Sequence, residues 1–366
     1  MAQAGRQREP NDRPSDGGPG AALVAEAAEA FERGDFGAAL SRAEAAVAAE
    51  PRSIPALHFR AAALTELARL DEARESYEQA LEVDEDDLDV LLGAADLYVD
   101  RLQSPEPDRE WLERGLELAL HGEKRARRAR EPEAAGEFAL LQAIAQNQLG
   151  RATEALARAE AALADLPGDV DALLERGFAL YELCRFDDAA GQLREIVRIS
   201  PDEAWAHHLL GLLAERRGDA READKRFARA RKLAPQDFPR PVSLSPAAFD
   251  QALEEAVESL PEPIGGYLAN VAIAVEDIPA DDDLIASDPP LSPSILGIFR
   301  GSPLGHKQSM DPWSHFPSSI VLYQRNLERF ARDRKELVEQ IGITLIHEVG
   351  HFLGLDEEQL WERGLE

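Results

Sequence analysis

"RGDFGAALSRAEAAVAAEP", residues Arg33–Pro51, recurs in altered form along the first two thirds of this 366-residue sequence. "LGRATEALARAEAALADLP" spans Leu149–Pro167, and "RGDAREADKRFARARKLAP" spans Arg217–Pro235. Each copy carries a glycine at its second position, continues with small and apolar residues at helical spacing, and ends in proline. We therefore expect a repeated helical unit rather than a single compact core.

A turn residue returns at a fixed period through this region. The turn position holds Gly34, Ala68, Gly150, Cys184 and Gly218, with steps of 34 residues except after Ala68. Five residues later stand Ala39, Ala73, Ala155, Ala189 and Ala223, and seventeen residues later stand Pro51, Glu85, Pro167, Pro201 and Pro235. Glycine favours a left-handed turn, small alanines let two helices approach closely, and proline stops a helix. The period thus predicts helix–turn–helix units, in which Cys184 is a small packing residue.

This 34-residue pattern resembles the tetratricopeptide repeat (TPR) family over roughly residues 21–240. The resemblance implies an all-α solenoid whose concave face binds a protein or peptide. The interval from Ala68 to Gly150 is 82 residues, 14 more than two periods, and predicts one atypical repeat near residues 86–135. Its loop is expected at Leu102–Asp108. Residues 1–20, rich in Pro, Gly and Asp, are expected to form a disordered tail.

The residue pattern changes near residue 240, where four prolines in Ala234–Pro246 predict a linker. Residues 241–366 are expected to form a small α+β domain with its own core. Its expected elements are a helix capped by Ser245 that runs through Leu260, strands at 270–277, 295–301 and 319–324, a short helix at 326–332, and a final helix capped by Asp333.

That final helix leads into "TLIHEVGHFLGLDEE", residues Thr344–Glu358. His347 and His351 are four residues apart, so both imidazoles project from one face and can bind one zinc ion. Glu348 follows His347 directly, where a general base can activate a zinc-bound water for hydrolysis.

Beyond the two histidines, Gly354 is expected to end the helix and to turn the chain back toward the metal. An acid from the next segment then becomes the third ligand. Glu357, ten residues after His347, stands at the third-ligand position of H-E-x-x-H-x-x-G-x-x-H/D patterns, and Asp356 is the alternative.

"HEVGHFLG", with the preceding "IVLYQRNLERFARDRKELVEQIGITLI", resembles the minimal zincin-like metallopeptidases, a bacterial family. The resemblance covers roughly residues 245–366. It implies that His347 and His351 are zinc ligands, that Glu348 is the base, and that Glu357 replaces the usual third-ligand aspartate. The predicted function is a zinc-dependent metallopeptidase with a TPR interaction scaffold. The alternative is a non-catalytic TPR adaptor with a vestigial or structural metal site.

Composition excludes several other classes of function. The net charge of −30 disfavours nucleic acid and anionic membrane as partners. No apolar run approaches the length of a transmembrane helix, the first twenty residues lack the apolar core of a secretory signal, and Cys184 is the single cysteine. We therefore expect a cytoplasmic protein in a reducing compartment.

Weaker candidates have simpler interpretations. His306 and His315 are expected to lie on a polar loop, Asp281–Asp283 on a solvated loop, and Tyr323 in the packing of a strand. The basic run Glu123–Arg130 is expected to be the solvent face of a helix whose arginines pair with nearby acids.

Overall fold

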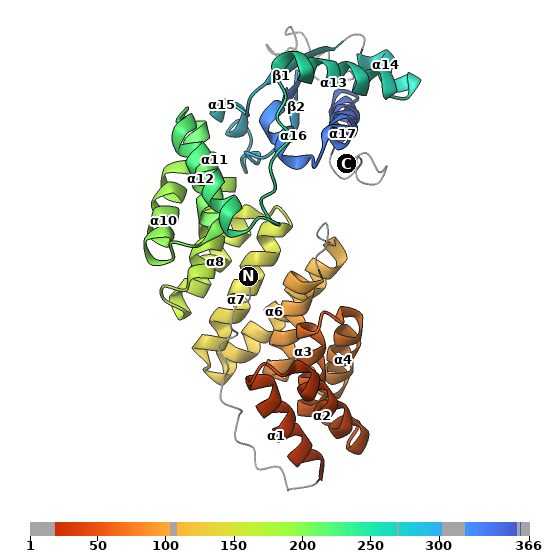
Figure 1. Cartoon of the computed structure of the whole chain (residues 1–366), viewed down its shortest axis with the longest axis vertical. Helices are drawn as coiled ribbons and strands as arrows, with labels where there is room; N and C mark the ends of the chain where they lie inside the picture. Colours follow the sequence, from red (N-terminus) through yellow and green to blue (C-terminus); the bar gives the residue numbers. More distant parts are fainter. Residues whose placement is uncertain (1–18, 103–107, 269–270, 302–318, 357–358, 360–366) are drawn as a thin grey trace. The chain divides into compact units, whose positions relative to one another are not determined.

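The computed structural model describes residues 19–102, 108–268, 271–301, 319–356 and 359 of the chain (Figure 1). Tertiary contacts divide the chain into two compact units, Met1–Glu175 and Arg176–Glu366. The boundary falls inside helix α9 (Val170–Glu182), so each unit contains helices of the predicted repeats.

The first unit is built from helices that follow one another in antiparallel pairs. They are α1 (Pro19–Glu32), α2 (Phe36–Ala49), α3 (Ile54–Glu66), α4 (Leu70–Val83), α5 (Leu88–Asp96), the π-helical turn η1 (Leu97–Arg101), α6 (Arg109–Ala129), α7 (Pro132–Gln148) and α8 (Ala152–Asp165). The three repeat helices α10 (Phe186–Ile199), α11 (Ala204–Arg216) and α12 (Ala220–Leu233) belong to the second unit.

The backbone at the turn positions confirms the predicted period. All five residues adopt positive φ, with values of 72–73° at the three glycines, 57° at Ala68 and 56° at Cys184. The five alanines that follow are 0–3% exposed, so their small side chains face the partner helix. The second helix of each pair also ends two residues before the position predicted to stop it, as α2 does before Pro51.

The atypical repeat differs from its neighbours in helix length. α6 has 21 residues, whereas α2, α4, α8, α10 and α12 have 14 each. Asp108 caps α6 by accepting from the amides of Glu110 and Trp111. The extra residues thus lengthen a helix. Of the loop predicted at Leu102–Asp108, residues 103–107 lie outside the described residues.

The basic run lies on α6, and its arginines pair with acids as expected. Arg127 contacts Glu123 at 3.2 Å and Asp165 at 2.5 Å, and Arg125 contacts Asp86 at 3.2 Å. These ion pairs explain a cluster of arginines in an acidic protein without a separate binding role.

After the repeats, the second unit changes to mixed structure. Its elements are α13 (Pro246–Ser259), α14 (Glu262–Leu268), β1 (Ala272–Glu276), α15 (Asp281–Leu284), β2 (Gly297–Arg300), β3 (Ser319–Tyr323), α16 (Gln324–Phe330) and α17 (Arg334–Phe352). Each expected strand is present with slightly shorter bounds, and α16 begins two residues earlier than expected. Ser245 caps α13 by accepting from the amide of Ala248 at 3.3 Å.

β3 is the central strand of a three-stranded sheet in the order β1–β3–β2. β1 runs parallel to β3, with Ala272 opposite Ser319, and β2 runs antiparallel to it, with Gly297 opposite Leu322. β2 and β3 follow one another along the chain and pair, whereas β1 pairs with β3 across the intervening β2 in the sequence.

The core of this domain lies beneath α13 and α17. Phe249 of α13, Ile320 and Leu322 of β3, and Leu337 and Leu345 of α17 are 0% exposed and belong to one cluster. Every residue of that cluster lies between 242 and 353, which agrees with the expected small α+β domain with its own core. Among the described residues, no helix has the length and apolarity that crossing a bilayer requires.

Candidate metal centre

The helix that carries the histidines is fixed at its start by the predicted cap. Asp333 accepts from the amide of Glu336 at 3.0 Å, and the carboxylate of Glu336 accepts from the amide of Arg332 at 2.6 Å. The first bond satisfies an amide that the first turn of a helix leaves without a partner, and the second ties the residue before the cap to that turn. One strip of α17 is then buried at 0% exposure, at Leu337, Ile341, Leu345 and Val349. This strip holds the helix on the core and turns the opposite side outward.

A glycine in β2 lets α17 approach the sheet. A Cβ atom at Gly297 would lie 2.8 Å from the Cγ2 of Thr344 and 3.1 Å from the carbonyl oxygen of Val321. Glu348 follows Thr344 by four residues and therefore shares its side of the helix. Its side chain is 5% exposed, so its carboxylate is screened from bulk water.

His347 and His351 converge on the outer side of α17. Their Nε2 atoms are 3.1 Å apart, and their rings meet edge to face with centroids 4.8 Å apart. Both residues are half-buried. The spacing of four residues brings the two imidazoles together as the sequence predicted.

The end of α17 fixes the orientation of His351. Gly354 has φ of 87°, its amide donates to the carbonyl of His351 at 3.0 Å, and the amide of Leu355 donates to the carbonyl of Gly350 at 3.0 Å. This is the pattern of a glycine-terminated helix, and it confirms the turn expected at Gly354.

The same turn brings the carbonyl of Leu355 to 3.2 Å from the Nδ1 of His351. A carbonyl can only accept, so Nδ1 carries the proton and Nε2 presents its lone pair toward His347. The sequence did not predict this contact, because every residue type supplies a backbone carbonyl. Gly354 was its only signal, because it predicted the turn that brings the carbonyl to His351.

The spacing of the two nitrogens fits a metal ion. Two ligands of a tetrahedral zinc at about 2.0–2.1 Å lie roughly 3.3 Å from each other, within a few tenths of an ångström of the spacing here. Among the described residues, no group of three or more His, Cys, Asp or Glu side chains is arranged to hold a metal. The histidines therefore provide two suitable ligands, and a further one has to come from elsewhere.

The acids after Gly354 differ in what the structure describes. Glu357 lies outside the described residues. Asp356 is exposed, its carboxylate accepts from the amide of Gln359 at 2.9 Å, and its own amide donates to the side chain of Gln359 at 3.2 Å. Both the side chain and the backbone amide of Asp356 are therefore bonded to Gln359.

The remaining candidate site residues differ in what the structure shows of them. His306 and His315 lie outside the described residues. Tyr323 is fully buried, and burial raises its pKa to about 12. Side chains alternate along β3, so Tyr323 lies on the opposite face from Ile320 and Leu322, which face the core that includes α17. Its complete burial there agrees with a packing role.

Asp281–Asp283 form the short helix α15 rather than a loop, which corrects the sequence-based expectation. Two of them are drawn into ion pairs, Asp281 with Arg216 and Asp283 with Arg300. Cys184 is half-buried, and burial raises the pKa of its thiol to about 11, in line with a packing role rather than a reactive one.

Comparisons with known families find both kinds of domain in the chain. A model of the zincin-like metallopeptidases matches residues 268–365, and a tetratricopeptide repeat model matches residues 146–213. The chain joins a TPR solenoid to a zincin-like domain. The comparison with curated proteins gives no match.

Solved structures similar to this chain are TPR proteins. PilW, described as a widely conserved type IV pilus biogenesis factor, matches with a TM-score of 0.51 and 20% identity, over 59% of this chain and 94% of its own. PilF of Pseudomonas aeruginosa matches with a TM-score of 0.49 and 18% identity, over 63% of this chain and 96% of its own. At these identities the likeness to PilW concerns the fold alone.

Proposed function

We propose that the zincin-like domain is a zinc-dependent metallopeptidase in which His347, His351 and Glu357 hold the metal. The observation that carries the proposal is the 3.1 Å spacing of the two Nε2 atoms, together with the bond from His351 to the carbonyl of Leu355. A metal-binding imidazole needs an unprotonated nitrogen, and the bond to Leu355 supplies it on the correct side of the ring. The bonds of Asp356 to Gln359 favour Glu357 as the third ligand.

When bound, zinc would supply Lewis acidity, which polarises a peptide carbonyl and makes water a stronger acid. Glu348 is proposed as the general base. It takes a proton from the attacking water as the new carbon–oxygen bond forms, and passes that proton to the departing amine as the carbon–nitrogen bond breaks. Its burial supports this role, since a screened carboxylate exchanges protons with its neighbours rather than with bulk water.

We further propose that the TPR region binds a protein or peptide, substrate or partner, on its concave face. This region presents stacked helix pairs, and its fold is shared with PilW. The strongly negative net charge favours partners with basic segments. The single cysteine supports a cytoplasmic location.

The decisive experiment compares zinc content and peptide cleavage in the full chain. Wild type is expected to retain one zinc ion after dialysis and to cleave members of a peptide library, followed by mass spectrometry. Glu348→Gln should keep the zinc and lose about 10²–10⁴-fold in cleavage rate, the usual share of a general base. His347→Ala should lose both.

His121→Gln is the matched control, because His121 is half-exposed on α6 and pairs with Asp86. It should behave as wild type. Cleavage by Glu348→Gln at the wild-type rate would refute the mechanism. Zinc without cleavage in every variant would favour the non-catalytic adaptor.

A second pair of variants separates the two acids. Glu357→Gln should weaken zinc affinity more than about 100-fold, beyond what the loss of a residue that only supports a ligand costs, whereas Asp356→Asn should change it little. Competition with a chromophoric chelator measures both affinities. The reverse order would make Asp356 the ligand.

A further inference from the structure

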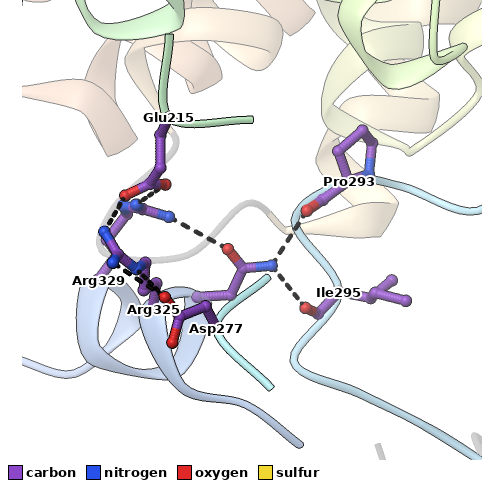
Figure 2. Close-up of polar contacts among 7 residues, drawn as sticks. Glu215, Asp277, Pro293, Ile295, Arg325 and Arg329 are labelled. Atoms are coloured by element: carbon purple, nitrogen blue, oxygen red, sulfur yellow. Dashed lines mark hydrogen bonds and ion pairs between the residues drawn. The ribbon is translucent and has the colours of Figure 1, made fainter. Parts of the chain in front are cut away.

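A buried carboxylate at the end of α11 joins the last helix pair of the repeats to the zincin-like domain. Glu215 accepts from the Nη1 of Arg325 at 2.9 Å and from Arg329, and both arginines belong to α16 (Figure 2). The side chain of Glu215 is only 11% exposed. A carboxylate this buried is stabilised by its partners rather than by water, so these two charge-assisted bonds carry weight.

α16 is in turn tied to the chain that precedes β2. The side-chain amide of Asn326 is buried and donates to the carbonyls of Pro293 at 3.0 Å and Ile295 at 2.7 Å. Arg329 bridges the two sets of contacts, since it also donates to the side-chain oxygen of Asn326 at 3.2 Å. We call Glu215, Arg325, Arg329 and Asn326 the Glu215 cluster.

Further contacts across this junction are also polar or charged. Arg216, whose side chain is 8% exposed, pairs with Asp281 and donates to the carbonyl of Pro279 at 2.9 Å. The guanidinium of Arg329 lies 5.4 Å from the ring centre of Phe227 on α12. Within the domain, Arg325 also binds Asp277, directly after β1, at 2.9 Å.

The apolar cores on the two sides are built from separate residues. One cluster includes Ala204, Ala230 and Phe238 of the repeat side, and the domain core lies within residues 242–353. A junction made by charges between separate cores responds to charge, because ion pairs weaken with salt and with neutralisation whereas apolar packing does not.

We propose that the Glu215 cluster is a charge-dependent contact that holds the zincin-like domain to α11 and α12. While the ion pairs of the Glu215 cluster are formed, the domain and the last helix pair move as one body. Neutralising Glu215 breaks these ion pairs, and α16 then loses its support from the repeats. The proposal concerns the junction and stands whether or not the domain hydrolyses peptides.

Hydrogen exchange of the full chain, followed by mass spectrometry, tests this proposal. Glu215→Gln keeps the size of the side chain but removes its charge, and should speed exchange within residues 324–330 by at least about tenfold. Glu195→Gln is the matched control, because it neutralises an exposed acid that pairs with Arg198 on α10. It should leave residues 324–330 unchanged.

Two additional measurements keep the outcome clear. Raising the salt from about 0.1 to 1 M shortens the screening length from roughly 10 to 3 Å, and should speed exchange of residues 324–330 in wild type but not of residues 36–49 in α2. Arg325→Gln combined with Arg329→Gln removes the two cations that bind Glu215 and should also speed exchange of residues 324–330. Unchanged exchange in Glu215→Gln, or an equal rise in Glu195→Gln, would overturn the proposal.

Discussion

The repeats and the zincin-like domain reach their structures by different routes. In the repeats, each turn, alanine contact and helix end follows from residues within one 34-residue period. In the zincin-like domain, α17 rests on Phe249, Gly297 and Ile320, which come from three distant segments. A local structure tolerates damage locally, whereas a core assembled from distant segments is lost as a whole.

The largest expected effect comes from emptying the domain core. Leu345→Ala removes a side chain that is 0% exposed on the strip of α17 facing the core. The lost burial and the cavity together should lower the free energy of unfolding of this domain by about 3 kcal/mol. Region-resolved hydrogen exchange under increasing urea should show residues 334–352 opening early while residues 36–49 keep wild-type protection.

Ile343→Ala is the control for this change. It shortens a side chain on the same helix that is 41% exposed, so its cost should stay below about 0.5 kcal/mol. Equal losses in the two variants would mean that α17 is not anchored through its buried strip, and early opening of α2 would erase the contrast between the two regions.

A smaller effect is expected from a partly buried acid of the repeats. Burial raises the pKa of Glu175 to about 7, against the donor bond from Asn147 that lowers it. Between pH 4.5 and 7 the unfolded chain gives up this proton before the folded chain does, so the free energy of unfolding falls as pH rises through that window.

Glu175→Gln cannot ionise and should remove this fall, stabilising the first unit by about 2 kcal/mol at pH 8 and by little at pH 4. Urea unfolding across that range, with Glu154→Gln as an exposed acid on α8 for comparison, measures the difference. A gain that does not depend on pH would point to packing rather than to titration.

The smallest changes test the turn positions themselves. Gly150 has φ of 72° and open space where a Cβ atom would lie, so Gly150→Ala should cost about 1 kcal/mol from backbone strain alone. Ala68 is exposed at φ of 57°, so Ala68→Gly should gain a similar amount. Thermal unfolding should show shifts of opposite sign, and shifts of the same sign would contradict the role of the left-handed turn.

Sequence reasoning succeeded where the deciding interaction is short in range. Asp333 caps α17 because Glu336 is three residues away, and His347 meets His351 because four residues make about one helical turn. It failed at Asp281–Asp283, which form α15 rather than a loop, because the arginines that pair with two of these acids lie on other elements.

The sequence alone therefore determined the repeat period, the positive φ at Ala68 and Cys184, the cap of α17 and the pairing of its histidines. Only the tertiary structure decided that β3 lies between β1 and β2, that the carbonyl of Leu355 orients His351, and that Glu215 binds two arginines more than a hundred residues away. The physical reason is range. A helix or turn is decided by neighbours along the chain, whereas these contacts depend on where distant segments finally pack.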